Sequence, residues 1–260
     1  MNKALVFLLL FNLLPLLAGG VNLMAAGRYW NFPPLPPPYE YGNILINRVS
    51  GKNNMKPVYF SHWNHRLRYT CRVCHFELDF EFEVNKTEIT EEDNRNGIFC
   101  GTCHNGKEAF AHTPENCGKC HTGTVSIGRE KFRELAGTTP KGLFGNKIDW
   151  GLALKSKRIA PLYSIFNEQE KPLAFNKDLE LAATWNYVPP AYFPHEAHTQ
   201  WLDCANCHPD IFNIQKKTTE NFAMKYILEK KFCGVCHLKV AFPLDDCAGC
   251  HPAMNRGGNE

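Results

Sequence analysis

The stretch Tyr59-Phe60-Ser61-His62-Trp63-Asn64-His65, followed closely by Cys71-Arg72-Val73-Cys74-His75, decides the fold of this chain. A C-x-x-C-H motif places two thiols on one turn of chain, where each can bond to a vinyl group of the same porphyrin. The histidine then lies under the ring, so this is the attachment signature of c-type haem. All 12 cysteines fall into six such motifs. The expected attachment residues are Cys71, Cys74, Cys100, Cys103, Cys117, Cys120, Cys204, Cys207, Cys233, Cys236, Cys247 and Cys250, and the expected proximal iron ligands are His75, His104, His121, His208, His237 and His251.

Two other interpretations of the cysteines need weighing. An exported chain with an even number of cysteines can be a disulfide scaffold, and paired C-x-x-C units can hold zinc through four thiolates. Neither interpretation requires a histidine after every pair, whereas haem attachment does. The sequence therefore predicts six covalently attached haem c groups.

The histidines outside these motifs show a second pattern. Tyr192-Phe193-Pro194-His195-Glu196-Ala197-His198 precedes the fourth motif and repeats the Y-F-x-H-x-x-H pattern of the opening stretch. Histidines at positions i and i+3 lie on one face of a helical turn, so two imidazoles can reach two neighbouring irons. The expected distal iron ligands from this pattern are His62, His65, His195 and His198.

The shared pattern reveals a duplicated module. The two halves keep a constant offset up to the second motif of each, and a three-residue deletion precedes the last motif. We predict a signal peptide at 1–26, a Pro-rich segment at 27–56, triheme module 1 at 57–122, a linker at 123–188, triheme module 2 at 189–254 and a tail at 255–260.

Each module is too short for a large core of its own. A polypeptide core of about 66 residues is marginal, so the haems must supply much of the buried apolar surface. The expected fold is small and haem-dominated, mostly irregular, with short α-helices and a small β-hairpin in each module. We further expect an exposed acidic strand at 76–84, helices at 129–136 and within 143–154, and an otherwise irregular linker.

The N-terminus predicts export. Met1-Asn2-Lys3 precedes an apolar run over 4–18 and then small residues, which is the layout of a cleavable signal peptide. A retained membrane anchor is the alternative, but the run is short for a span of about 20 residues. The mature protein is therefore expected in the periplasm or outside the cell, and not integral to the membrane. The net charge of +3 without a long basic run gives no reason to expect nucleic acid.

Each module resembles the c7-type triheme domain of the class III multihaem cytochromes, which are related to cytochrome c3. The resemblance covers both modules and rests on F-x-H-x-x-H followed by three C-x-x-C-H motifs. It implies that the first histidine of each pair ligates the first haem of its module and the second ligates the second haem. The implied pairs are His62 with His75, His65 with His104, His195 with His208, and His198 with His237.

The third haem of each module has a less regular partner. Some family repeats use a methionine upstream of the second motif, and Met224 matches that place, so we expect Met224 to ligate the sixth haem opposite His251. The alternative is that Met224 packs in the core of a helix over 219–230. Module 1 has Glu91 at this place, and we expect His112 to ligate the third haem there; otherwise that iron is open or bound by Met55.

The expected function is electron transport, because an iron with two axial protein ligands has no site for substrate. No catalytic residues are expected, and the partners would be redox proteins that act as electron donor and acceptor, with an extracellular acceptor as a further candidate. One alternative is a reductase of a small oxyanion at one open haem. Another is a subunit of an extracellular cytochrome filament, with the Pro-rich segment bound to a neighbour.

Overall fold

The structure, a computed structural model, describes residue 32, residues 34–215 and residues 222–254. The predicted signal peptide and tail therefore lie outside the described residues. Module 1 and its N-terminal flank contain β1 (Asn43–Ile46), η2 (Gly51–Asn53), β2 (Val58–Ser61), α2 (His62–Arg66), the π-helix η3 (Val73–Glu77), α3 (Glu91–Arg95), η4 (Phe99–Thr102), η5 (Pro114–Asn116) and α4 (Cys117–Cys120).

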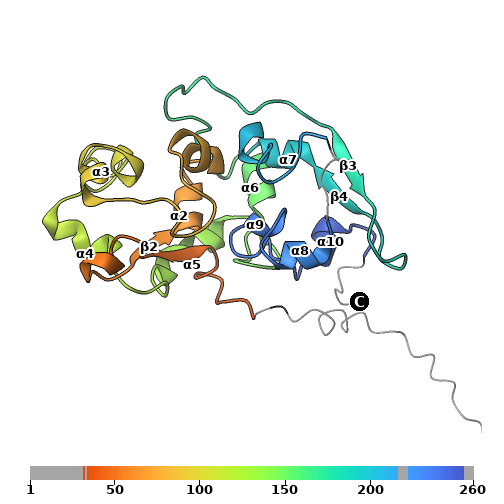
Figure 1. The fold of residues 1–260 in the computed structure, drawn as a ribbon, viewed down its shortest axis with the longest axis horizontal. Coiled ribbons are helices and arrows are strands. Elements are labelled where there is room, and N and C mark those ends of the chain that lie inside the picture. Colours follow the sequence, from red (N-terminus) through yellow and green to blue (C-terminus); the bar gives the residue numbers. More distant parts are fainter. Residues whose placement is uncertain (1–31, 33, 216–221, 255–260) are drawn as a thin grey trace, which may run out of the picture.

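The linker and module 2 follow with equally short elements. The linker contains α5 (Arg129–Thr138), α6 (Trp150–Lys155) and β3 (Asp178–Leu181). Module 2 contains β4 (Ala191–Pro194), α7 (His195–Thr199), η6 (Cys204–Asn206), α8 (Met224–Leu228), α9 (Gly234–His237) and α10 (Cys247–Cys250). Figure 1 shows the two modules side by side, with α2–α4 on the left and α7–α10 on the right.

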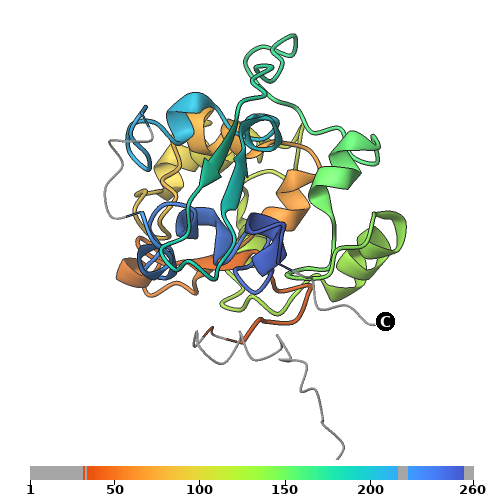
Figure 2. The same ribbon diagram turned by 90° about the vertical axis from the view of Figure 1, so that its right-hand side faces the viewer.

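The predicted small hairpin in each module is confirmed. In module 1, β1 pairs antiparallel with β2, with Ile44 opposite Phe60. In module 2, β3 pairs with β4 in the same way, with Leu179 opposite Phe193. Figure 2 faces module 2 and shows its hairpin running past the short helices. Each first strand is recruited from outside the predicted module, β1 from the Pro-rich segment and β3 from the linker.

Each second strand leads directly into the helix that carries the distal histidines. β2 ends at Ser61, whose hydroxyl accepts a hydrogen bond from the backbone N–H of Asn64 and so caps α2. Such a cap satisfies one of the free N–H groups at a helix start. The hairpin therefore fixes where the histidines of α2 lie, and β4 has the same position before α7.

The expected strand at 76–84 is wrong. Residues Val73–Glu77 form a π-helix, and no strand follows before α3. The alternating phenylalanines serve the haem site instead. Phe82 stacks on the ring of His75 at 4.3 Å between centroids, and the carbonyl of Phe80 binds His75 Nδ1 at 2.7 Å.

The linker is more ordered than its sequence suggested. The predicted helix at 129–136 is confirmed as α5, and the turn and helix within 143–154 correspond to a turn followed by α6. The sequence analysis missed β3, although its residues Asp-Leu-Glu-Leu alternate and their burial alternates with them. For α8, the described helix begins at Met224, and residues 219–221 of the predicted span 219–230 lie outside the description.

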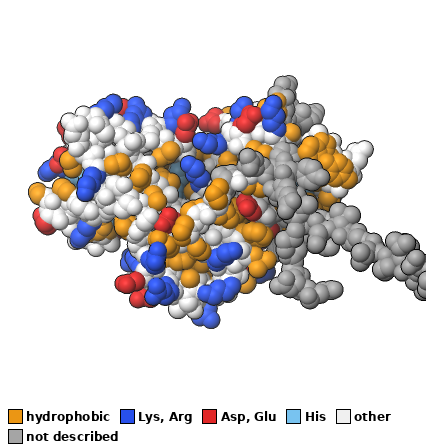
Figure 3. All heavy atoms as spheres, turned by 90° about the horizontal axis from the view of Figure 1, so that it is seen from below, with side chains coloured by type: hydrophobic (Ala, Val, Ile, Leu, Met, Phe, Trp, Pro, Cys, Tyr) orange, Lys and Arg blue, Asp and Glu red, His pale blue; other side chains and the backbone are white. Residues whose placement is uncertain are grey.

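A small aromatic core fastens the linker to module 1. Trp63 is 2% exposed and packs edge-on against Phe132 of α5, with 5.2 Å between ring centroids, and Ile148 completes the cluster. The indole N–H donates to the carbonyl of Tyr39 at 3.0 Å. Elsewhere, large apolar side chains such as Phe76 and Phe242 are exposed, and hydrophobic groups lie between Lys and Arg side chains on the face in Figure 3. This pattern fits a fold in which haem supplies much of the apolar interior.

We expect Trp63→Ala to lower the free energy of unfolding by about 3–5 kcal/mol, because it removes a buried indole and leaves a cavity. Chemical denaturation of the haem-loaded protein would measure the loss. The matched control is Trp185→Ala, where the indole is 44% exposed, and its effect should be much smaller. Equal losses in the two variants would contradict the assignment of Trp63 to the core.

Candidate haem centres

All 12 cysteines lie in described residues, and none forms a disulfide. The described part of the chain also holds no cluster of three or more His, Cys, Asp or Glu side chains suited to a metal ion. In each motif the chain turns in a short helical segment around the cysteines. A C-x-x-C-H motif needs such a compact turn so that both cysteines can reach one porphyrin.

Most of the histidines are held in a way that suits a ligand to haem iron. Every histidine except His112 has its Nδ1 hydrogen-bonded to a backbone carbonyl, at 2.5–3.2 Å. Such a bond fixes the ring orientation and leaves Nε2 free for a metal. This arrangement fits the six proximal positions and the four histidines of the Y-F-x-H-x-x-H pattern.

The structure places the rings of two of the expected ligand pairs close together and tilted relative to each other. The ring centroids of His65 and His104 lie 6.3 Å apart, and those of His198 and His237 lie 6.2 Å apart. Two imidazoles on one iron are separated by about 6 Å, from two metal–nitrogen bonds of about 2 Å and half a ring on each side. The interplanar angles are also alike, 54° and 59°. Both modules therefore hold their second histidine pair in nearly the same relative geometry.

The surroundings of these pairs repeat as well. Phe60 stacks on His65 at 4.4 Å, and Phe193 stacks on His198 at 4.2 Å. These apolar rings restrict the histidine side chains and shield them from water.

Burial keeps the ligand histidines neutral. It lowers the pKa of His62 to about 3 and that of His237 to about 4. It also lowers the pKa of His65 and His198. A neutral imidazole is the form that binds a metal.

The other expected pairs are placed less directly. His75 lies close enough to His62 to help lower its pKa, after burial and with smaller effects from Arg66 and His65. His195 and His208 hold their Nδ1 atoms on the carbonyls of Lys177 and Phe212, at 2.5 and 2.9 Å.

The third haem site of module 1 has unusual surroundings. His112 Nδ1 is buried and has no hydrogen-bond partner. The ion pair with Arg95 holds the pKa of Glu91 below its ordinary value, and the nearby His112 and His121 rings act in the same direction. The start of α3 therefore lies near His112 and the third motif. Met224 has the matching place at the start of α8 in module 2 and is half-buried.

The most buried ion pair among the described residues was missed by the sequence analysis. Arg72 lies between the cysteines of the first motif, and its guanidinium binds Glu77 at 2.5 Å, Glu170 at 2.7 Å and Asp203 at 3.2 Å. Spacer residues in C-x-x-C-H motifs carry no fixed chemistry, so only the charge of Arg72 within a haem motif could have drawn attention to it.

No helix in the described residues is long and apolar enough to cross a bilayer.

Comparison with known proteins agrees with the motif pattern. The family model for cytochrome c7 and related cytochrome c matches residues 58–122 and 191–252. A solved c7-type three-heme cytochrome domain is 34% identical, over 33% of this chain and 94% of that one, with a TM-score of 0.27. The C-terminal hexaheme fragment of GSU1996 is 27% identical, over 84% of this chain and 99% of that one, with a TM-score of 0.27.

Dodecaheme cytochrome c GSU1996 is 25% identical, over 82% of this chain and 75% of that one, with a TM-score of 0.28. None of the curated proteins matches. The superpositions are too poor to support an argument, so the relationship rests on the family model, the identity to the three-heme domain and the motifs. With two matched segments and six haem c attachment motifs, this chain belongs to the cytochrome c7 family of multihaem c-type cytochromes.

Proposed function

We propose that this chain is a six-haem electron carrier that works in the periplasm or outside the cell. The observation that carries the proposal is the close approach of His65 to His104 and of His198 to His237, with nearly the same ring distance and tilt in both modules. An iron held from both sides has no open position for a substrate, which favours electron transfer over chemistry at the metal.

The proposed axial ligands follow the duplicated pattern. Haems one, two, four and five are held by two histidines each, the third by His121 and His112, and the sixth by His251 and Met224. The assignment of His112 is supported by Glu91, which lies near both His112 and His121, and that of Met224 by its position at the start of α8. The bis-histidine pairs are His62 with His75, His65 with His104, His195 with His208, and His198 with His237.

The chain's own residues orient and insulate the haems. When bound, the haems supply one-electron redox chemistry at iron. The carbonyl bonds at Nδ1 hold each ring in position and make it a stronger donor. Because the ligands are fixed before and after electron transfer, little has to move when the charge of an iron changes.

The proposed location follows from covalent haem and the N-terminal sequence. Its partners would be redox proteins on either side of the chain, and an extracellular acceptor is included in the proposal. Module 1 is the more acidic module, so a basic donor or acceptor would be steered to it in a salt-dependent way.

Carbon monoxide tests the proposal against the alternative of a reductase with an open haem. The reduced protein should not bind carbon monoxide at neutral pH, because all six irons would hold two protein ligands. Rapid binding at one haem per chain would overturn the proposal of a pure electron carrier.

We expect Met224→His to lower the most positive step in a redox titration. A thioether is a weaker donor than imidazole and favours ferrous iron, so Met/His ligation raises the potential above that of bis-histidine ligation. The substitution should also remove the Met–iron charge-transfer band of the ferric protein. Met55→His, at a side chain 45% exposed, is the control and should leave both unchanged. A ferric protein without that band before substitution would contradict the assignment of Met224.

A further inference from the structure

The first haem motif contacts the fourth motif directly. The backbone N–H of Arg72 donates to the carbonyl of Trp201 at 2.8 Å. The side-chain amide of Asn206 donates to the carbonyl of His75 at 2.9 Å. Arg72 is a spacer residue of the first motif and Asn206 is a spacer residue of the fourth, so these bonds join two haem attachment sites across the modules.

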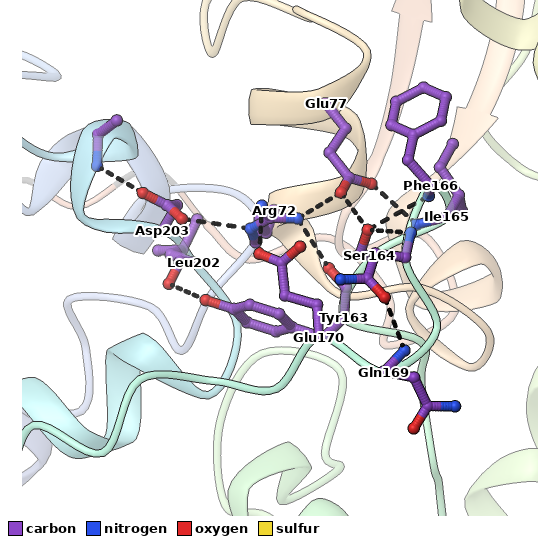
Figure 4. Close-up of polar contacts among 12 residues, drawn as sticks. Arg72, Glu77, Tyr163, Ser164, Ile165, Phe166, Gln169, Glu170, Leu202 and Asp203 are labelled. Atoms are coloured by element: carbon purple, nitrogen blue, oxygen red, sulfur yellow. Dashed lines mark hydrogen bonds and ion pairs between the residues drawn. The ribbon is translucent and has the colours of Figure 1, made fainter.

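The side chain of Arg72 strengthens the same junction. It is 6% exposed and binds carboxylates from three segments. Glu77 ends the π-helix after the first motif, Glu170 belongs to the linker, and Asp203 immediately precedes the fourth motif (Figure 4). One guanidinium thus ties module 1, the linker and module 2 together.

The linker covers this junction. The hydroxyl of Ser164, which is 1% exposed, donates to Glu77 at 2.5 Å, and the backbone N–H of Ile165 donates to the other carboxylate oxygen at 2.9 Å. On the other side, the hydroxyl of Tyr163 donates to the carbonyl of Leu202 at 3.3 Å. These contacts shield the Arg72–Glu77 pair from water, which strengthens its attraction, whereas the side chains of Glu170 and Asp203 are 35% and 28% exposed.

A second set of bonds also connects the first haem site with module 2. The guanidinium of Arg66, the last residue of α2, donates to the carbonyl of Val240 at 3.3 Å. The hydroxyl of Tyr41 donates to the carbonyl of Ala241 at 2.6 Å. Both acceptors follow the fifth motif.

The third motif, which is the last motif of module 1, lies on the side of module 1 that is away from module 2 (Figure 1). His121 Nδ1 binds the carbonyl of Lys56 at 2.7 Å, and the Cys117 thiol donates to the carbonyl of Thr113. Among the described residues, the hydrogen bonds of this motif stay within module 1 and its flank. Figure 1 shows α4 at the left end of the molecule, away from α8–α10.

We propose that electrons pass between the two modules through the first haem, which we call the port. We further propose that Arg72, Asp203 and Asn206 are positioning residues that hold this haem against module 2. The third haem then ends the path in module 1 instead of leading to the fourth. In each crossing one iron is oxidised from ferrous to ferric and the iron across the junction is reduced from ferric to ferrous, so no further reactant is needed. This inference rests on the proposed function.

Exchange NMR of the partly reduced, haem-loaded full chain tests the proposal without a variant. With the haem methyl signals assigned to each haem, the strongest electron exchange between modules should join the first haem to a haem of module 2. A strongest pair that contains the second or third haem would overturn the proposal. The proposed function has a different outcome in the same experiment: it fails if fewer than six haems are reversibly reduced, whichever haems exchange electrons.

Asn206→Asp tests the positioning role. It keeps the side-chain oxygen that accepts from the backbone N–H of Asp203 but replaces the donor to the His75 carbonyl by a repelling oxygen. Exchange between modules should slow, while exchange within each module stays unchanged. The matched control is Asn105→Asp, which removes a similar 2.9 Å bond to the carbonyl of Thr102 away from the junction and should leave exchange between modules unchanged.

Unchanged exchange between modules in Asn206→Asp, or equal slowing within and between modules, would overturn the positioning role. If the variant does not mature, the pair found in the unmodified protein still decides which haem is the port.

Discussion

Replacing His198 by alanine should open the fifth haem while leaving its thioether bonds intact. The ring of His198 lies opposite His237 and is held by a 2.8 Å bond from Nδ1 to the carbonyl of Pro194. Removal of this ring leaves the iron with one axial ligand from the protein, so it should become high-spin and bind carbon monoxide when reduced. The attachment cysteines, Cys233 and Cys236, are untouched.

The ferric spectrum and carbon monoxide titration of the variant measure this change. One haem per chain should respond and the other five should stay low-spin. His65→Ala is the matched variant in module 1 and should open the second haem in the same way. A fully low-spin spectrum for His198→Ala would show that His198 is not an iron ligand.

Arg72→Met should cost about 3–5 kcal/mol of unfolding free energy, because it leaves the buried carboxylate of Glu77 without its cation. The side chains of Arg72 and Glu77 are each 6% exposed. Burial alone would lower the pKa of Arg72, but its bonds to Glu77 and Asp203 raise the pKa above its ordinary value. The cation therefore stays charged at any pH at which the protein is folded.

The matched control for this variant is an exposed ion pair of the same kind. Arg95 binds Glu91 at 2.5 Å across one helical turn, with side chains 59% and 66% exposed. Arg95→Met should cost no more than about 0.5 kcal/mol. Denaturant unfolding of both variants, followed by far-ultraviolet circular dichroism, gives the comparison, and similar losses would contradict a structural role for the Arg72 cluster.

The motifs that predict the haem sites could be recognised in the sequence because haem attachment needs fixed local spacing. Both the C-x-x-C-H motifs and the paired histidines of α2 and α7 depend on contacts within a few residues. Helix α5 could also be predicted, because the helical pattern of residues 129–136 is a local property.

The structural features that could not be predicted from the sequence depend on contacts between distant segments of the chain. The alternation at 76–84 was interpreted as a strand, because nothing local reveals that Glu77 binds Arg72 and that Phe82 stacks on the ring of His75. Likewise, β3 forms only when the linker reaches β4. The junction of Arg72 with Asp203 joins residues far apart in the chain, and a single sequence carries no signal for it.

The haem content of the mature chain tests the central claim most directly. The intact mass of the denatured protein should exceed that of the polypeptide by six haem groups, and acid–acetone extraction should release none of them, because each is bound through thioethers to a C-x-x-C-H motif. A mass excess of fewer than six haems, or haem released by the extraction, would contradict the account.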